Sequence, residues 1–157
     1  MYYGSRKIST EPVPVSTRIT FDSEEIGDYN LPAGTARVYE NTESRLIFVG
    51  SDNIPTIQNG DDFKIQTGKT MDVTAEFTLE SFEINRSNYE HKLSAKFKNA
   101  KDKAVTVEWL ETITGEWELK TRYQNWDQKD ASTARFLVDI PAKGEKEIII
   151  EVKVTRK

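Results

Sequence analysis

Hydrophobic and polar residues alternate with a period of two along most of this chain, and this alternation most limits what the chain can fold into. Residues 71–82 and 89–99 are the longest examples, and no window of a dozen residues carries a helical stripe. Strands with one hydrophobic face must bury that face against another layer. We therefore expect an all-β protein, an antiparallel β-sandwich of immunoglobulin-like or Greek-key type with about ten strands.

These two long segments fit each other in one antiparallel register that satisfies both faces. On the hydrophobic face, Phe77 lies opposite Ala95, so a large side chain meets a small one. On the polar face, residues of opposite charge meet. The full set of expected pairs is Ala75–Phe97, Glu76–Lys96, Phe77–Ala95, Thr78–Ser94, Leu79–Leu93 and Glu80–Lys92.

Turn residues between the alternating segments predict further strands and three further hairpins. Gly115 is suited to a tight turn because glycine adopts positive φ readily. The predicted hairpins join 35–40 to 45–50, 104–113 to 117–123, and 133–140 to 147–154. Short strands are expected at 16–22 and 63–67, a turn at 68–69, and loops at 52–62 and 124–132.

The length of 157 residues suits one compact unit. We expect residues 1–30 to be an extended segment with an edge strand, because Pro12 and Pro14 disfavour both helices and central strands. Residues 31–157 are expected to be the sandwich domain, entered through the turn "LPAGTARVYE". The beginning of the chain, "MYYGS", reads like the middle of a strand, so we expect the unit to be cut from a larger protein.

Charge and composition argue against several classes of function. The 26 acidic residues outnumber the 22 basic ones and are interleaved with them, so no basic face for nucleic acid is expected. No hydrophobic run is long enough to span a membrane, and the first ten residues lack the apolar segment of a signal peptide. The chain has no cysteine, which rules out disulfides and thiol chemistry.

No group of residues in the sequence forms a recognisable catalytic or metal-binding motif. The single histidine, His91, falls on or near the hydrophobic face of its strand, where a structural role is the better reading. Asp52, Asp61 and Asp62 flank one loop but do not have the spacing of a calcium loop, so we expect a solvated turn. We predict no catalytic residues, no metal site and no cofactor, and a carboxylate-based hydrolase ranks third among the functions considered.

The tryptophans suggest the main alternative to a purely structural role. Trp109 and Trp117 fall on hydrophobic faces and are expected in the core. Trp126 lies among polar residues in "NWDQKD", where an indole ring either caps the edge of a sandwich or stacks on a ligand. Exposed aromatic side chains bind sugars in many sandwiches, so Trp126 with Tyr123 makes a carbohydrate-binding module the second function considered.

An ordered series of segments resembles a known family. The series is "LPAGTARVYE", "LIFVGSDNI", "GKTMDVTAE", "KNAKDKAVTVEWLE", "GEWEL", "KDASTARFLVDIPAKGEKEI" and "VKV". It resembles the C-terminal domain of unknown function of mucoidy-inhibitor-like bacterial proteins, domain of unknown function 4139, over residues 31–154. Where that family has a His-Thr-Pro run before a glycine, this chain has Thr56, Ile57 and Gln58.

The resemblance implies a role but supplies no catalytic residues. Members of the family look like multi-domain bacterial proteins in which this domain follows an N-terminal partner, and many appear exported. It therefore implies a non-catalytic structural or protein-interaction domain of an envelope-associated protein, in the periplasm or at the cell surface. The expected partner is the protein's own N-terminal region or another protein, with a glycan as the alternative.

Overall fold

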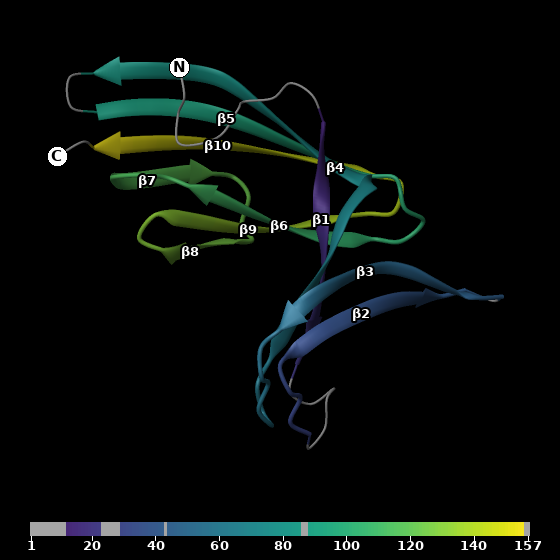
Figure 1. Cartoon of the computed structure of the whole chain (residues 1–157). Coiled ribbons are helices and arrows are strands. Elements are labelled where there is room, and N and C mark those ends of the chain that lie inside the picture. The colour runs from purple at the N-terminus through teal and green to yellow at the C-terminus, as the bar shows by residue number, and fades with distance from the viewer. Residues whose placement is uncertain (1–11, 23–28, 43, 86–87, 156–157) are drawn as a thin grey trace. The chain divides into compact units, whose positions relative to one another are not determined.

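The computed structural model describes residues 12–22, 29–42, 44–85 and 88–155 (Figure 1). These residues form ten antiparallel strands in three sheets, one of them curled into a half-barrel, and no helix. The all-β class and the number of strands predicted from the sequence are therefore confirmed. The strands are β1 (Val13–Phe21), β2 (Gly34–Asn41), β3 (Leu46–Ile54), β4 (Phe63–Asn85), β5 (Asn88–Asn99), β6 (Val105–Thr112), β7 (Glu116–Thr121), β8 (Trp126–Asp130), β9 (Thr133–Ile140) and β10 (Glu145–Thr155).

Contacts along the chain separate two compact units. We call residues 16–70 the hairpin unit, and residues 1–15 with 71–157 the layered unit. The domain boundaries expected from the sequence, 1–30 and 31–157, stay a prediction.

In the layered unit, two sheets share one hydrophobic core. The first sheet has the order β1-β4-β5-β10-β7, although most of β1 and residues 63–70 of β4 fall in the hairpin unit, and the second sheet has the order β6-β9-β8. Trp109 of β6 lies at the centre, with its ring 4.5 Å from the ring of Phe136 and 5.9 Å from that of Phe97. Phe136 and Phe97 are almost completely buried. Alternation thus places one face of each strand in the core, as large aromatic side chains favour.

The predicted register between β4 and β5 is confirmed from Ala75 to Leu79. Phe77 lies opposite Ala95, and Thr78 lies opposite Ser94. The pairing of Glu80 with Lys92 is wrong at the level of the backbone, because the register shifts between Leu79 and Ser81 and Lys92 faces Ser81. Glu80 is the extra residue of a β-bulge, an irregularity that face matching alone does not reveal.

The structure corrects two of the predicted hairpins. β6 pairs with β9 and β7 pairs with β10, so residues 104–113 and 117–123 belong to different sheets. Likewise β9 and β10 do not pair with each other, and β10 lies between β5 and β7. Sequence neighbours with matching hydrophobic faces can face each other across a core as well as pair side by side, and alternation does not distinguish the two.

Two predictions of irregular structure are also wrong. Residues 124–132 were expected to be a loop, but Trp126–Asp130 forms β8 and pairs with β9. The turn expected at 68–69 is absent from the described residues, since β4 runs without a break from Phe63 to Asn85. Gly68, at φ 130°, is accommodated inside the strand. The hairpin of 35–40 with 45–50 is confirmed as β2 and β3.

A buried asparagine links the turn that follows β5 to the turn that follows β9 at one end of the layered unit. Asn99 is 1% exposed, and its Nδ2 donates to the backbone oxygens of Lys103 and Pro141. Its Oδ1 accepts from the N–H of Lys101. Every polar atom of this side chain therefore bonds to a turn, as burial of an amide requires. Sequence reasoning did not single out Asn99.

Candidate functional site

Among the described residues, two surface regions are candidates for binding because neither is part of the packed core. Each lies within one unit. The first is the hydrophobic face of the β2–β3 hairpin. The second is a groove on the outer face of the five-stranded sheet.

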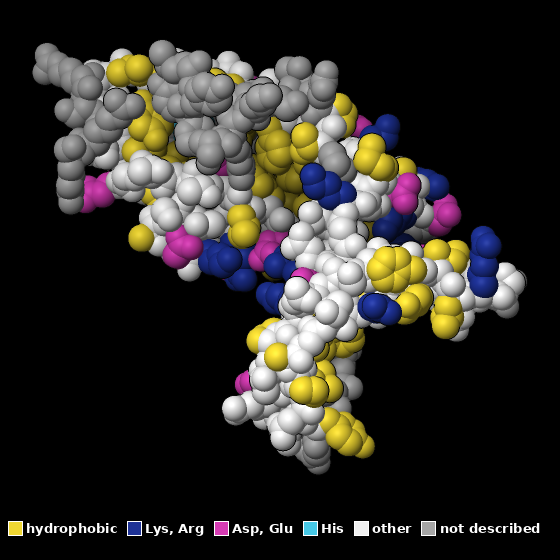
Figure 2. All heavy atoms as spheres, in the orientation of Figure 1, with side chains coloured by type: hydrophobic (Ala, Val, Ile, Leu, Met, Phe, Trp, Pro, Cys, Tyr) yellow, Lys and Arg dark blue, Asp and Glu magenta, His cyan; other side chains and the backbone are white. Residues whose placement is uncertain are grey.

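The hairpin face, defined here by Tyr39, Leu46 and Phe48, exposes large hydrophobic side chains. Their exposed fractions are 48%, 66% and 56%. Tyr39 lies opposite Phe48 in the register, and their rings meet edge to face at 5.5 Å. Figure 2 shows hydrophobic side chains gathered over this hairpin. Among the described residues, β2 and β3 pair only with each other.

Local contacts shape the hairpin. At its tip, Thr42 closes the turn through its N–H and its hydroxyl, both bonded to the carbonyl of Arg45. A bulge between Val38 and Tyr39 shifts the register. At its base, the carboxylate of Asp52 accepts from the N–H of Gln66 at 2.9 Å. The hairpin thus has a defined shape, although a two-stranded ribbon with an uncovered apolar face is marginal in water.

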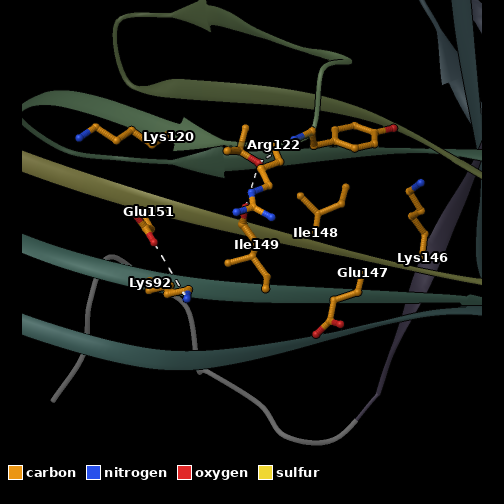
Figure 3. A pocket seen from close by; sticks show the side chains of 10 residues that line it. Lys92, Lys120, Arg122, Lys146, Glu147, Ile148, Ile149 and Glu151 are labelled. Atoms are coloured by element: carbon orange, nitrogen blue, oxygen red, sulfur yellow. Dashed lines mark hydrogen bonds and ion pairs between the residues drawn. The ribbon is translucent and has the colours of Figure 1, made fainter.

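The groove has a volume of about 750 Å³ and lies over β5, β10 and β7 (Figure 3). Four cations line it: Lys92, Lys120, Arg122 and Lys146. Its two carboxylates are Glu147 and Glu151. Ile149 is 40% exposed and supplies an apolar part of the lining.

The carboxylates of the groove already have partners within the sheet. Glu147 accepts a hydrogen bond from the hydroxyl of Ser94 at 2.7 Å. Glu151 lies 4.0 Å from the Nζ of Lys92, and that Nζ also lies 3.2 Å from Glu80. Basic and acidic side chains thus lie next to each other on neighbouring strands, and such pairs stabilise a sheet modestly.

Tyr123, one of the two residues predicted to bind a ligand, lines this groove. Its hydroxyl donates to the backbone oxygen of Leu137 at 2.6 Å, and the Nζ of Lys146 lies 5.8 Å from the centre of its ring. Burial raises the pKa of the Tyr123 phenol, so the hydroxyl keeps its proton.

Trp126, the other residue, does not line this groove. Its ring stacks on Phe136 at 5.8 Å, and it is half-buried at the edge of the core. The structure thus places it where an indole ring can cap the core. Its role in binding a sugar stays a prediction.

His91 lies on the core side of β5. Its backbone is opposite Phe82 on one side and Val152 on the other, and its ring stacks on Tyr89 at 6.0 Å. Burial lowers the pKa of the imidazole below its usual value, which favours the neutral form. A depression of about 210 Å³ beside it also contains Glu118 and the ion pair of Glu90 with Lys153.

The acidic loop of the hairpin unit uses its carboxylates for local hydrogen bonds. Asp52 accepts from the N–H groups of Asn53 and Gln66, and Asp61 accepts from that of Gln58. Within the described part of the chain, no three histidine or acidic side chains cluster as metal ligands would. The same residues include no helix suited to crossing a membrane.

Comparisons with known proteins found no match for this chain. No protein-family model, curated protein or solved structure matched it.

Proposed function

We propose that this chain is a non-catalytic interaction domain of a larger, envelope-associated bacterial protein, as its resemblance to the mucoidy-inhibitor-like C-terminal domain implies. The observation that carries the proposal is the hairpin face. Three large hydrophobic side chains are about half exposed or more on a ribbon that, among the described residues, pairs with no third strand. Exposed apolar groups of this kind mark interaction sites in folded proteins.

The partner we propose is another polypeptide, either a part of the same protein that precedes this domain or a second protein. A protein surface can pack against Tyr39 and Phe48 and pair with the free edge of a strand. Arg37 lies on the same face as Tyr39, two residues before it, so a partner with a hydrophobic centre and an acidic margin fits best.

We also propose that the layered unit is an immunoglobulin-like Greek-key sandwich. Its support is a layer of β4, β5, β10 and β7 facing a layer of β6, β9 and β8 across one core. In an immunoglobulin constant domain the fifth strand lies between the second and the fourth. Here the last strand, β10, takes that place, so the likeness concerns the layers rather than the order of strands.

A photo-cross-linking experiment tests the interaction surface. Benzoylphenylalanine in place of Phe48 in the full-length protein is expected to cross-link to one defined segment, which mass spectrometry identifies. Substituting Tyr39 and Leu46 by serine is expected to abolish that cross-link. The matched control places the cross-linker at Met71, which is 77% exposed. Equal products from both positions, or products that survive the serine substitutions, would contradict the proposal.

A further inference from the structure

We propose that the groove over β5, β10 and β7 binds a small organic anion, one that carries a carboxylate or phosphate group beside an apolar part. Arg122 is the residue that holds the anionic group. This proposal concerns the layered unit alone and does not depend on the hairpin face or on the proposed interaction role.

Arg122 stands between two anchored residues at the end of β7. The hydroxyl of Thr121 donates to the backbone oxygen of Ile149 at 2.8 Å and accepts from the N–H of Tyr123 at 3.1 Å. The hydroxyl of Tyr123 bonds to Leu137. The backbone on both sides of Arg122 is thereby fixed. In Figure 3 its side chain extends from β7 over β10, beside Ile149.

The charges around Arg122 leave a local surplus of cations. Of the six ionisable side chains other than Tyr123 that line the groove, four are basic and two acidic. Lys92 is paired with Glu80 and Glu151, and Glu147 accepts from the neutral hydroxyl of Ser94 but keeps its charge, so the surplus is that of Lys120, Arg122 and Lys146 over Glu147. Across the described part of the chain, neither Arg122 nor Lys120 forms an ion pair with a carboxylate. This surplus occurs in a protein whose net charge is −4.

A guanidinium group in this setting favours a carboxylate or phosphate. Its planar fork donates two parallel hydrogen bonds to either group, whereas an ammonium group acts as a point charge. The volume of about 750 Å³ lies within the range of sites for small molecules. Ile149 offers an apolar surface to the rest of the ligand, and Lys120 and Lys146 add charge on either side.

Titrations of the isotope-labelled protein with glutarate and, separately, with inorganic phosphate test this site by NMR. Glutarate carries carboxylates beside an apolar chain, and phosphate carries no apolar part. We expect glutarate to shift the amide signals of Arg122, Tyr123 and Ile149 with an affinity on the order of millimolar, because such a groove is open to water. Tighter binding of phosphate than of glutarate would assign the anionic group as a phosphate.

Substitution of Arg122 distinguishes a defined anion-binding site from general electrostatic attraction of anions to the protein. Arg122→Gln is expected to weaken binding about tenfold, the effect of losing one charge-assisted pair of bonds, and Arg122→Lys to restore only part of it. The control is Lys129→Gln, which removes an exposed cation from β8 and is expected to leave binding unchanged. Unchanged thermal unfolding shows that each variant is folded.

Three results would each overturn the proposal. The first is the absence of signal shifts with both anions. The second is equal binding by Arg122→Gln and the unsubstituted protein. The third is an equal loss in Lys129→Gln, which would mean that the anions respond only to overall charge.

Discussion

The Nζ of Lys92 lies 3.2 Å from Oε2 of Glu80, although the residue opposite Lys92 in the backbone register is Ser81. The bulge moves Glu80 out of the ladder, but its side chain still reaches the lysine. The ion pair expected from the sequence therefore forms without the backbone pairing from which it was inferred. Salt bridges of long side chains tolerate a shift of one residue in a way that packed hydrophobic pairs do not.

Removing this ion pair is expected to cost little stability. Both side chains are about one-third exposed, at 37% for Lys92 and 33% for Glu80. Water screens such a pair, so Glu80→Gln should lower the free energy of unfolding by less than about 1 kcal/mol, as urea denaturation would measure. The control Glu76→Gln probes the regular part of the same strand. A loss several times larger in Glu80→Gln alone would mean that the bulge itself depends on the charge.

Gly50 in β3 is expected to tolerate no side chain. A Cβ at this position would lie 1.9 Å from the backbone oxygen of Thr67, so the two segments would have to move apart. Gly50→Ala should therefore lower the free energy of unfolding of the hairpin unit by about 2 kcal/mol or more. Hydrogen exchange of the β2 and β3 amides measures this effect locally.

Gly34→Ala is the matched control, because a Cβ at Gly34 would meet nothing within 4 Å. It should change protection of the same amides by little. Equal effects of the two substitutions would show that the close approach of Gly50 to Thr67 does not limit this position.

Truncation of Trp126 is expected to weaken the core edge. Its ring stacks on Phe136, which is fully buried, so Trp126→Ala should lower the free energy of unfolding by about 2 kcal/mol, less than the roughly 3–5 kcal/mol for a fully buried tryptophan because Trp126 is only half-buried. Trp126→Phe should recover most of this loss. Urea denaturation followed by far-ultraviolet circular dichroism avoids the change in fluorescence.

The same variants test the carbohydrate-binding prediction. If Trp126 only caps the core, a panel of glycans should bind Trp126→Phe and the unsubstituted protein equally or bind neither. Selective loss of glycan binding in folded Trp126→Phe would instead assign this ring to a ligand, together with Tyr123.

Stability should fall as the solution is acidified through the range in which His91 titrates. Burial lowers the pKa of His91 in the folded protein below its ordinary value of 6.5, so the unfolded chain takes up the proton first. This loss of stability is absent well above the ordinary pKa and grows as the pH falls from that value toward the lower pKa of the folded state. Urea midpoints measured between about pH 7.5 and 5.5 should show it.

His91→Gln is the control for this pH dependence. Glutamine does not titrate, so the decline between these pH values should become shallower in the variant. An identical decline in both proteins would attribute the pH effect to carboxylates and remove His91 from the explanation.

Alternation was sufficient to predict the class of fold and the pairing of β4 with β5. The opposition of Phe77 with Ala95 satisfies size and polarity together, and a shift by one residue would turn each hydrophobic side chain to the wrong face. It was insufficient to predict how sheets are assembled. β9 and β10 each have one hydrophobic face, and this pattern is equally compatible with pairing in one sheet and with packing across the core.

The candidate surfaces were only partly visible in the sequence. Tyr123 was predicted only as a companion of Trp126, and the groove that it lines depends on β10 lying between β5 and β7. Arg122 was missed because one arginine among many charges carries no signal until its neighbours are placed. The strand β8 was missed because it is short and, apart from Trp126, polar.

The bulge at Glu80 also marks a position at which β4 can lose one residue. Before it, odd-numbered hydrophobic residues of β4 share the core side with their partners in β5, and after it even-numbered ones do so, such as Phe82 opposite His91. Loss of the codon for Glu80 would leave Leu79 opposite Leu93 and Ser81 opposite Lys92 in one regular ladder. A deletion of this one residue of β4 therefore turns no core-facing side chain outward.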